Sequence, residues 1–155
     1  MKAVELADET GPVRGGSETI LVAEDHDGLR ELACETLSNL GYDIVLACDG
    51  EQAIQEFQQH ADRIDMLLLD VVMPKINGPD AYARMSAERP NVPVILATGY
   101  SADIALLHTA EDQGFVVLQK PYAPRDLARR VRETLDQSLA KPPHAEARAK
   151  QGSVA

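Results

Sequence analysis

Residues 19–50 read TILVAEDHDGLRELACETLSNLGYDIVLACDG, in which short apolar runs alternate with a longer mixed stretch. Two short apolar runs, Thr19–Ala23 and Asp43–Ala47, have the length of strands and are continuous, as expected for strands buried on both faces. Between them, apolar residues recur at three- and four-residue spacing from Leu29 to Leu40, which predicts a helix. The stretch therefore predicts a strand, a helix and a second strand.

The rest of the chain repeats this alternation. Further apolar runs of strand length follow at Met66–Leu69, Val94–Ala97 and Val116–Leu118. Helical stretches separate and follow them, with Asp49 placed to cap one helix and Pro124 placed in the first turn of the last. Strands that alternate with helices predict a parallel sheet with helices on both faces. We therefore predict an α/β fold of the flavodoxin-like (βα)5 type, a doubly wound parallel sheet with strand order 2-1-3-4-5.

The composition excludes several classes of protein. The chain has 155 residues, of which 45% are hydrophobic, so one domain with a buried core is expected. It carries 15 basic and 25 acidic residues, and this net charge of −10 repels phosphate backbones, so we expect no direct binding of nucleic acid. No apolar run approaches the roughly 20 residues of a membrane span, and no signal peptide is visible. We expect a cytoplasmic domain without membrane insertion.

The two ends of the chain differ from its middle. Residues 1–17 are rich in glycine and show no periodicity, and residues 138–155 contain Pro142 and Pro143 among Ala, Lys and Gln. Neither end has the apolar content that would offset the entropy of ordering. We predict a flexible N-terminal tail or linker at 1–17, a folded domain at 18–137 and a flexible C-terminal tail at 138–155.

Chemically active side chains follow four of the predicted strands. Glu24 and Asp25 follow the first strand, Asp70 the third, Thr98 the fourth and Lys120 the fifth. Because ligands bind beyond the carboxyl ends of such strands, we expect these side chains to meet. Close carboxylates repel by roughly 4 kcal/mol per pair at an effective dielectric near 20, which favours a bound cation, and hard oxygen ligands suit Mg²⁺. With Lys120 and Thr98 beside it, Asp70 is the expected nucleophile for a phosphoryl group.

Four motifs contain these residues: LVAEDHD at 21–27, LLLDVVMPKINGPD at 67–80, ILATGY at 95–100 and LQKPY at 118–122. On these motifs, residues 19–135 resemble the CheY-like receiver domain of bacterial two-component response regulators. The resemblance implies that Asp70 takes a phosphoryl group from a histidine kinase or a histidine phosphotransfer protein. It implies a self-catalysed reaction on the receiver itself, and so a signalling protein that is not an enzyme in the usual sense.

The resemblance also assigns roles to the neighbouring residues. It implies that Asp25, Asp70 and the backbone carbonyl of Val72 bind Mg²⁺ directly and that Glu24 acts mostly through water. Thr98 is expected to contact the phosphoryl group and Lys120 to pair with it, and the peptide bond from Lys120 to the next proline is expected to be cis. Met73-Pro74 and Gly78 match the loop that follows the phosphoacceptor in the family.

One position departs from the family pattern, because Val117 stands where receivers usually carry an aromatic switch residue. We therefore predict that the loop from Gly99 to Asp103, with Tyr100 as the moving ring, carries the shift that phosphorylation causes. The predicted output face consists of the fourth helix, the fifth strand and the fifth helix. It includes the arginines from Arg125 to Arg132, which form a solvated face by their own pattern. The sequence fits both a stand-alone receiver and a domain of a hybrid histidine kinase.

Two other classes of protein share part of this pattern. A haloacid-dehalogenase-like aspartyl phosphatase also uses a strand-end Asp, Mg²⁺ and Lys. Such enzymes have a D-x-D motif in which the second Asp transfers protons, and Val72 stands at that position here. A flavin carrier needs a phosphate loop rich in small residues after the first strand, and AEDHDG at 23–28 would repel a flavin phosphate. The phosphatase is the alternative function that we carry forward.

Overall fold

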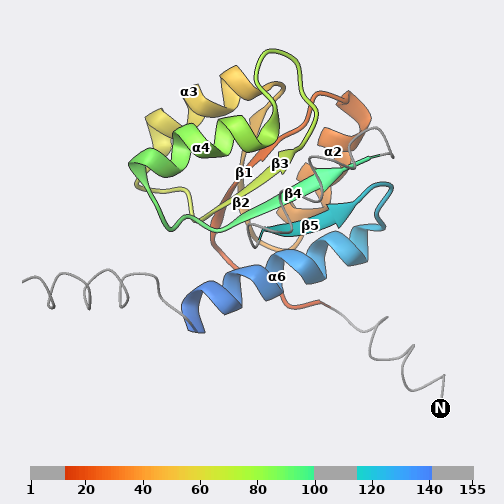
Figure 1. Ribbon diagram of the computed structural model, residues 1–155. Coiled ribbons are helices and arrows are strands. Elements are labelled where there is room, and N and C mark those ends of the chain that lie inside the picture. Colours follow the sequence, from red (N-terminus) through yellow and green to blue (C-terminus); the bar gives the residue numbers. More distant parts are fainter. Residues whose placement is uncertain (1–12, 100–114, 141–155) are drawn as a thin grey trace, which may run out of the picture.

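The computed structural model describes residues 13–99 and 115–140, and Figure 1 shows how their helices and strands are arranged. The strands are β1 (Thr19–Ala23), β2 (Asp43–Ala47), β3 (Met66–Asp70), β4 (Val94–Thr98) and β5 (Val116–Gln119). The helices are α2 (Asp27–Ser38), α3 (Gly50–His60), α4 (Gly78–Glu88) and α6 (Pro124–Ala140). Each predicted strand is present, and three of them extend one residue further than the sequence predicted.

The five strands form one parallel sheet in the order β2-β1-β3-β4-β5, so the predicted topology is confirmed. The strands β1, β3 and β4 are buried along their whole length, as their continuous apolar sequences predicted. The strands β2 and β5 have exposed positions, which corrects the expectation that every strand is buried on both faces; they are the edge strands, and each pairs with one neighbour only. The helix expected between β4 and β5 lies outside the described residues.

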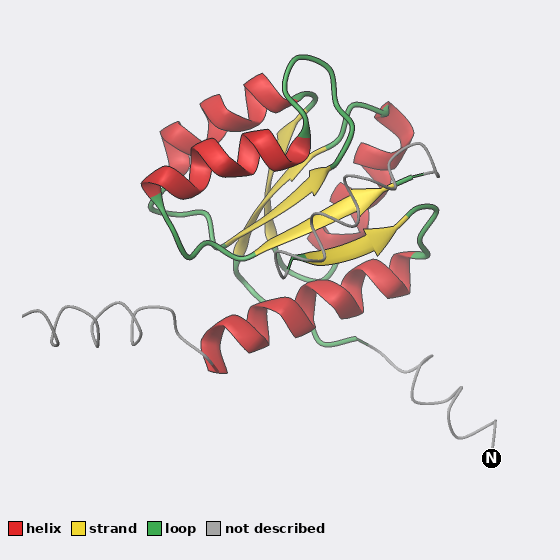
Figure 2. Cartoon of the chain, in the orientation of Figure 1, coloured by secondary structure: helices red, strands yellow, loops and turns green. Residues whose placement is uncertain are grey.

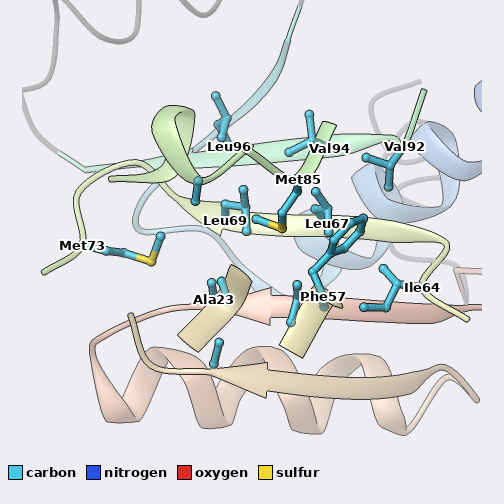
Figure 3. Close-up of a cluster of buried hydrophobic side chains, with 14 of the residues drawn as sticks. Ala23, Phe57, Ile64, Leu67, Leu69, Met73, Met85, Val92, Val94 and Leu96 are labelled. Atoms are coloured by element: carbon cyan, nitrogen blue, oxygen red, sulfur yellow. The ribbon is translucent and has the colours of Figure 1, made fainter. Parts of the chain in front are cut away.

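Alternate strand residues face opposite layers of helices, which pack on the two faces of the sheet (Figure 2). Leu67 and Leu69 point into a cluster with Phe57 of α3 and Met85 of α4, which Figure 3 shows from close by. The intervening strand residues, such as Leu68, form a second cluster with α2 and α6. Burying a large aliphatic or aromatic side chain stabilises a fold by about 1.5–3 kcal/mol, so these two layers hold the sheet rigid.

Local signals in the sequence set the ends of the helices. The side chain of Asp49 caps α3 by accepting a hydrogen bond from the backbone N–H of Gln52 at 2.7 Å, as predicted. Helix α6 begins at Pro124, the position in the first turn where proline is tolerated. Gly41 has a φ of +102°, which turns the chain from α2 into β2.

The arginines of α6 do not all lie on a solvated face, which corrects that part of the sequence analysis. Arg132 is 9% exposed. Its guanidinium donates to Glu18 Oε2 at 2.9 Å, to the carbonyl oxygen of Gly15 at 3.1 Å and to the hydroxyl of Tyr42 at 3.3 Å. Asp136 accepts from it as well and also pairs with Arg14. Arg132 is buried because the segment before β1 passes over it and supplies these acceptors.

No helix within the described ranges combines the length and the apolar character that crossing a membrane requires.

Candidate functional site

The polar residues predicted from the strand ends lie together at the carboxyl edge of the sheet, the edge to which the strand arrowheads point in Figure 2. Glu24 directly follows β1, Asp70 ends β3 and Thr98 ends β4. All three are buried, with exposed fractions of 4%, 5% and 2%. The parallel register explains this convergence, because it pairs Asp70 with Ala97 and Ala23 with Leu69, so neighbouring strands end at nearly the same height.

Lys120 joins two of the buried acids. Its Nζ lies 2.9 Å from Glu24 Oε1 and 2.9 Å from Asp70 Oδ2, and its side chain is 16% exposed. Burial opposes the charge of the ammonium group, but the hydrogen bonds to Glu24 and Asp70 outweigh burial and raise the pKa of Lys120. A positive charge is therefore held next to the Asp70 carboxyl at neutral pH.

Opposing effects act on the pKa of Asp70. Burial raises the pKa of Asp70 to about 7, the hydrogen bond from Lys120 opposes that rise, and the charge of Glu24 adds to it. Such a carboxyl is unstable as an isolated anion in this place, and a further positive charge would favour its ionised, nucleophilic form.

Asp25 completes an acidic cluster. One carboxylate oxygen from each of Glu24, Asp25 and Asp70 lies within 4.8 Å of the others. Glu24 and Asp70 are buried, whereas Asp25 is exposed and leaves the cluster open on one side. Three hard oxygen donors around a position that solvent reaches suit a divalent cation that keeps part of its water shell. The residues present therefore fit the predicted metal.

The loop after Asp70 is tied to the neighbouring strand and helix. The backbone N–H of Val71 donates to Ala97 O at 2.8 Å, and that of Gly78 donates to Val71 O at 2.9 Å. A Cβ on Gly78 would lie 2.4 Å from the carbonyl oxygen of Asp70, so only glycine lets helix α4 start this close to the site. Val72 lies in this loop with a 51% exposed side chain, and a role for its carbonyl stays a prediction.

The loop after β5 brings Lys120 to the site. The backbone N–H of Lys120 donates to Thr98 O at 2.7 Å, which links the ends of β4 and β5. The bond between Lys120 and Pro121 is cis, as the family resemblance implied. Tyr122 follows and packs against the hydrophobic cluster that contains Leu68, and burial raises the pKa of its hydroxyl to about 12.

Val117, which stands where receivers usually carry an aromatic residue, is half-buried. Val117 packs against the cluster that contains Phe57 and Met85, and its carbonyl accepts a hydrogen bond from Arg130 at 3.3 Å. Phe115 makes an edge-to-face contact with Tyr82, with ring centroids 5.1 Å apart. Gly99 is described, but Tyr100 and the remainder of the predicted switch loop lie outside the described residues.

Two residues outside the predicted site, Arg30 and His26, shape the loop between β1 and α2. Arg30 donates to the carbonyl oxygen of Glu24 at 2.9 Å and to Asp27 Oδ1 at 2.5 Å. The Nδ1 of His26 accepts from the backbone N–H of Leu29 at 3.2 Å and so caps α2. The three-residue spacing of Asp27 and Arg30 predicts their ion pair, but no pattern in the sequence predicts the contact of Arg30 with the carbonyl of Glu24.

Comparison with known proteins identifies the family of this chain. Residues 20–132 match the family model of the response regulator receiver domain. The chain is 31% identical over 121 residues to the sensor kinase CckA of Brucella abortus, a match that covers 78% of this chain and 13% of that protein. It is 35% identical over 119 residues to the transcriptional regulatory protein CpxR of Escherichia coli, covering 77% of this chain and 50% of CpxR. The chain thus spans half or less of these relatives.

A solved structure agrees with the sequence matches. The receiver domain of the hybrid histidine kinase CckA superposes with a TM-score of 0.64 at 32% identity, and the match covers 76% of this chain and 98% of that one. These matches lie among receivers and response regulators, and they lend no support to the aspartyl phosphatase that the sequence left as an alternative.

Proposed function

Because the chain belongs to the family of response regulator receiver domains, we propose that Asp70 accepts a phosphoryl group from a phosphohistidine of a partner protein. Receivers are signalling modules of two-component systems, and this chain is one of them. The observation that carries the assignment of Asp70 is its buried place at the carboxyl edge of the sheet, where Lys120 bridges it to Glu24.

The transfer that we propose is a displacement at phosphorus. A carboxylate oxygen of Asp70 forms the new bond to phosphorus as the bond between phosphorus and the histidine nitrogen breaks. The bonding electrons return to the imidazole, which takes up a proton, and an acyl phosphate remains on Asp70. In this proposal Lys120, which lies 2.9 Å from Asp70, pairs with the phosphoryl oxygens, and Thr98, at the end of the neighbouring strand, donates its hydroxyl to one of them.

We propose Mg²⁺ as the cation of the acidic cluster. Glu24, Asp25 and Asp70 would hold it, together with the backbone carbonyl of Val72, and when bound it would neutralise phosphoryl oxygens during transfer. The oxygen donors and the open side at Asp25 support this choice. The same residues would serve the self-catalysed loss of the phosphoryl group, because hydrolysis of an acyl phosphate needs the same neutralisation.

The proposal extends to the whole chain. We place the receiver domain at residues 18–137, with residues 1–17 and 138–155 as flanking segments, of which residues 14–16 contact the domain. Cys34 and Cys48 are free thiols, which agrees with a reducing compartment such as the cytoplasm. A histidine kinase or phosphotransfer protein would supply the phosphoryl group, and β5 and α6 would belong to the face that a downstream protein reads.

Phosphorylation by a small-molecule donor tests this proposal. The full chain, incubated with acetyl phosphate and Mg²⁺, should gain one phosphate that hydroxylamine removes, and peptide mass spectrometry should place it on Asp70. The variant Asp70→Asn should gain none, whereas Asp43→Asn, which removes an exposed acid of β2 that pairs with Arg63, should react like the unmodified chain. A stable phosphate on Asp70→Asn, or none on the unmodified chain, would contradict the assignment.

A further inference from the structure

Glu24 is held in place through almost all of its polar groups. Its backbone N–H donates to Ala47 O at 3.1 Å, its Oε1 lies 2.9 Å from Lys120 Nζ, and its Oε2 accepts from the backbone N–H of His26 at 3.0 Å. Its carbonyl oxygen accepts from the guanidinium of Arg30 at 2.9 Å. Glu24 therefore has a fixed position in the cluster.

Asp25 differs from Glu24 in this respect. It is exposed, and within the described ranges its carboxylate makes no hydrogen bond or ion pair. Its direction therefore depends on the backbone, and above all on the peptide group that joins it to Glu24. The carbonyl of that peptide is the group that Arg30 binds.

We propose that Arg30 is a positioning residue for the cation site. By holding the carbonyl of the peptide between Glu24 and Asp25, it fixes the direction in which Asp25 leaves β1 and so raises the affinity of the cluster for a divalent cation. Arg30 itself lies on α2 with a side chain that is 19% exposed, and its second contact, to Asp27 at 2.5 Å, holds the guanidinium in that orientation. This inference rests on the proposed function, in which the cluster binds Mg²⁺.

The charge of Arg30 has the opposite effect. A positive charge near the cluster repels a cation, so removing Arg30 would strengthen binding if the field dominated. Asp27 pairs closely with Arg30 and cancels most of its field at a distance, and solvent and salt screen the remainder. Loss of a group that orients a ligand typically lowers metal affinity by roughly 10–100-fold. The positioning effect is therefore the larger of the two, and the sign of the change in affinity distinguishes them.

Titration of the full chain with Mg²⁺ by isothermal calorimetry, at fixed ionic strength and without a phosphoryl donor, tests the proposal. Arg30→Gln, which keeps a polar side chain with two of the three methylenes and removes the charge, should bind Mg²⁺ roughly tenfold more weakly than the unmodified chain. Arg30→Lys, which keeps the charge and one donor, should lie between the two. The matched control is Arg63→Gln, because Arg63 pairs with an exposed acid at the opposite edge of the sheet, and it should leave the affinity unchanged.

Each outcome decides between explanations. Equal or tighter binding by Arg30→Gln overturns the positioning role, and equal weakening by Arg63→Gln overturns it as well. Arg30→Met replaces Arg30→Gln if circular dichroism shows the latter to be unfolded, with the same expectation. Asp25→Asn separates the two proposals: if it binds Mg²⁺ as the unmodified chain does, the cluster is not the cation site and both proposals fall. If it loses binding while Arg30→Gln keeps it, only the role of Arg30 falls.

Discussion

The Asp70 carboxyl is buried and shares the ammonium group of Lys120 with Glu24, and this placement costs stability. Burial is the main cause of its raised pKa, and the single ammonium group of Lys120 is shared between two carboxylates. The residue that we propose as the phosphoryl acceptor is therefore one whose ionised form the fold disfavours. A buried group with a strongly shifted pKa is typical of a functional site.

The raised pKa predicts a pH-dependent gain in stability for Asp70→Asn when Mg²⁺ is removed with a chelator. The pKa of Asp70 is raised from 3.8 to about 7, so ionisation penalises the folded state progressively as the pH rises through this window. Asn removes the penalty. Denaturant unfolding should show the variant more stable by roughly 2–4 kcal/mol at pH 8, with the difference vanishing near pH 4.

The control for this prediction is Asp43→Asn. Asp43 is exposed and pairs with Arg63, so its replacement should bring no gain in stability at either pH. If the free energy of unfolding of Asp70→Asn followed that of the unmodified chain from pH 4 to pH 8, Asp70 would not be the desolvated acid that its burial indicates.

Among the elements, the start of helix α4 is the one most closely fitted to the site. Gly78 opens α4, and its Cα lies so near the end of β3 that an added Cβ would lie 2.4 Å from the carbonyl oxygen of Asp70 and 3.1 Å from its carbonyl carbon. These atoms belong to the backbone and cannot move without shifting Asp70 itself. The helix α4 and the strand β3 therefore act as one unit.

Alanine at this position should separate the two elements. Gly78→Ala should destabilise the protein by about 1–3 kcal/mol, because the overpacked Cβ pushes α4 from β3, and it should slow phosphorylation of Asp70 by acetyl phosphate. Gly28→Ala is the matched control, since Gly28 lies in the first turn of α2 and an added Cβ there would meet only the side chain of His26, at 3.2 Å.

In that exposed helical position alanine should be neutral or stabilise by up to about 1 kcal/mol. Thermal melting and the rate of phosphorylation, measured for both variants, check the pair of predictions. Equal behaviour of the two variants would show that the close approach of Gly78 has no consequence for the site.

Across the whole molecule, one buried arginine joins segments that are far apart in the sequence. Arg132 on α6 binds Glu18, which precedes β1, and Tyr42, which precedes β2, and it also binds the carbonyl of Gly15. The segment before β1 is thereby fastened to the last helix, at the edge of the sheet opposite the acidic cluster.

The contact between Arg132 and Glu18 predicts a second pH dependence. Hydrogen bonding to Arg132 lowers the pKa of Glu18 below 4.5, so the stability that Glu18 contributes is present above pH 4.5 and is lost as the pH falls through the lowered value. Glu18→Gln should therefore cost about 1.5–3 kcal/mol at pH 7, the range for hydrogen bonds to charged groups, and much less near pH 3. Urea unfolding at both pH values measures the difference.

The exposed ion pair between Asp43 and Arg63 serves as the comparison for the contact between Glu18 and Arg132. Its removal by Arg63→Gln should cost less than about 1 kcal/mol at pH 7, because solvent screens both partners. If Glu18→Gln lowered the free energy of unfolding by no more than this, the contact between Glu18 and Arg132 would not stabilise the fold beyond an exposed ion pair.

Much of the site followed from the sequence alone. Continuous apolar runs predicted the buried strands, and the parallel order of those strands placed Glu24, Asp70 and Thr98 at one edge, since the direction of every strand was implied by the alternation with helices. The nature of the side chains after the strands then predicted an acidic, cation-binding cluster. These features depend on local pattern and on topology, which a single sequence carries.

The tertiary structure decided which groups those side chains contact. The burial of Arg132 could not be predicted, because its periodicity placed it on a helix rich in arginines while its partner Glu18 is 114 residues away. The contact of Arg30 with the carbonyl of Glu24 was invisible for another reason, since every residue has a carbonyl and no pattern marks the one that is bound. Periodicity determines the face on which a side chain lies, whereas its partners depend on how distant segments pack, and that packing exists only in the folded molecule.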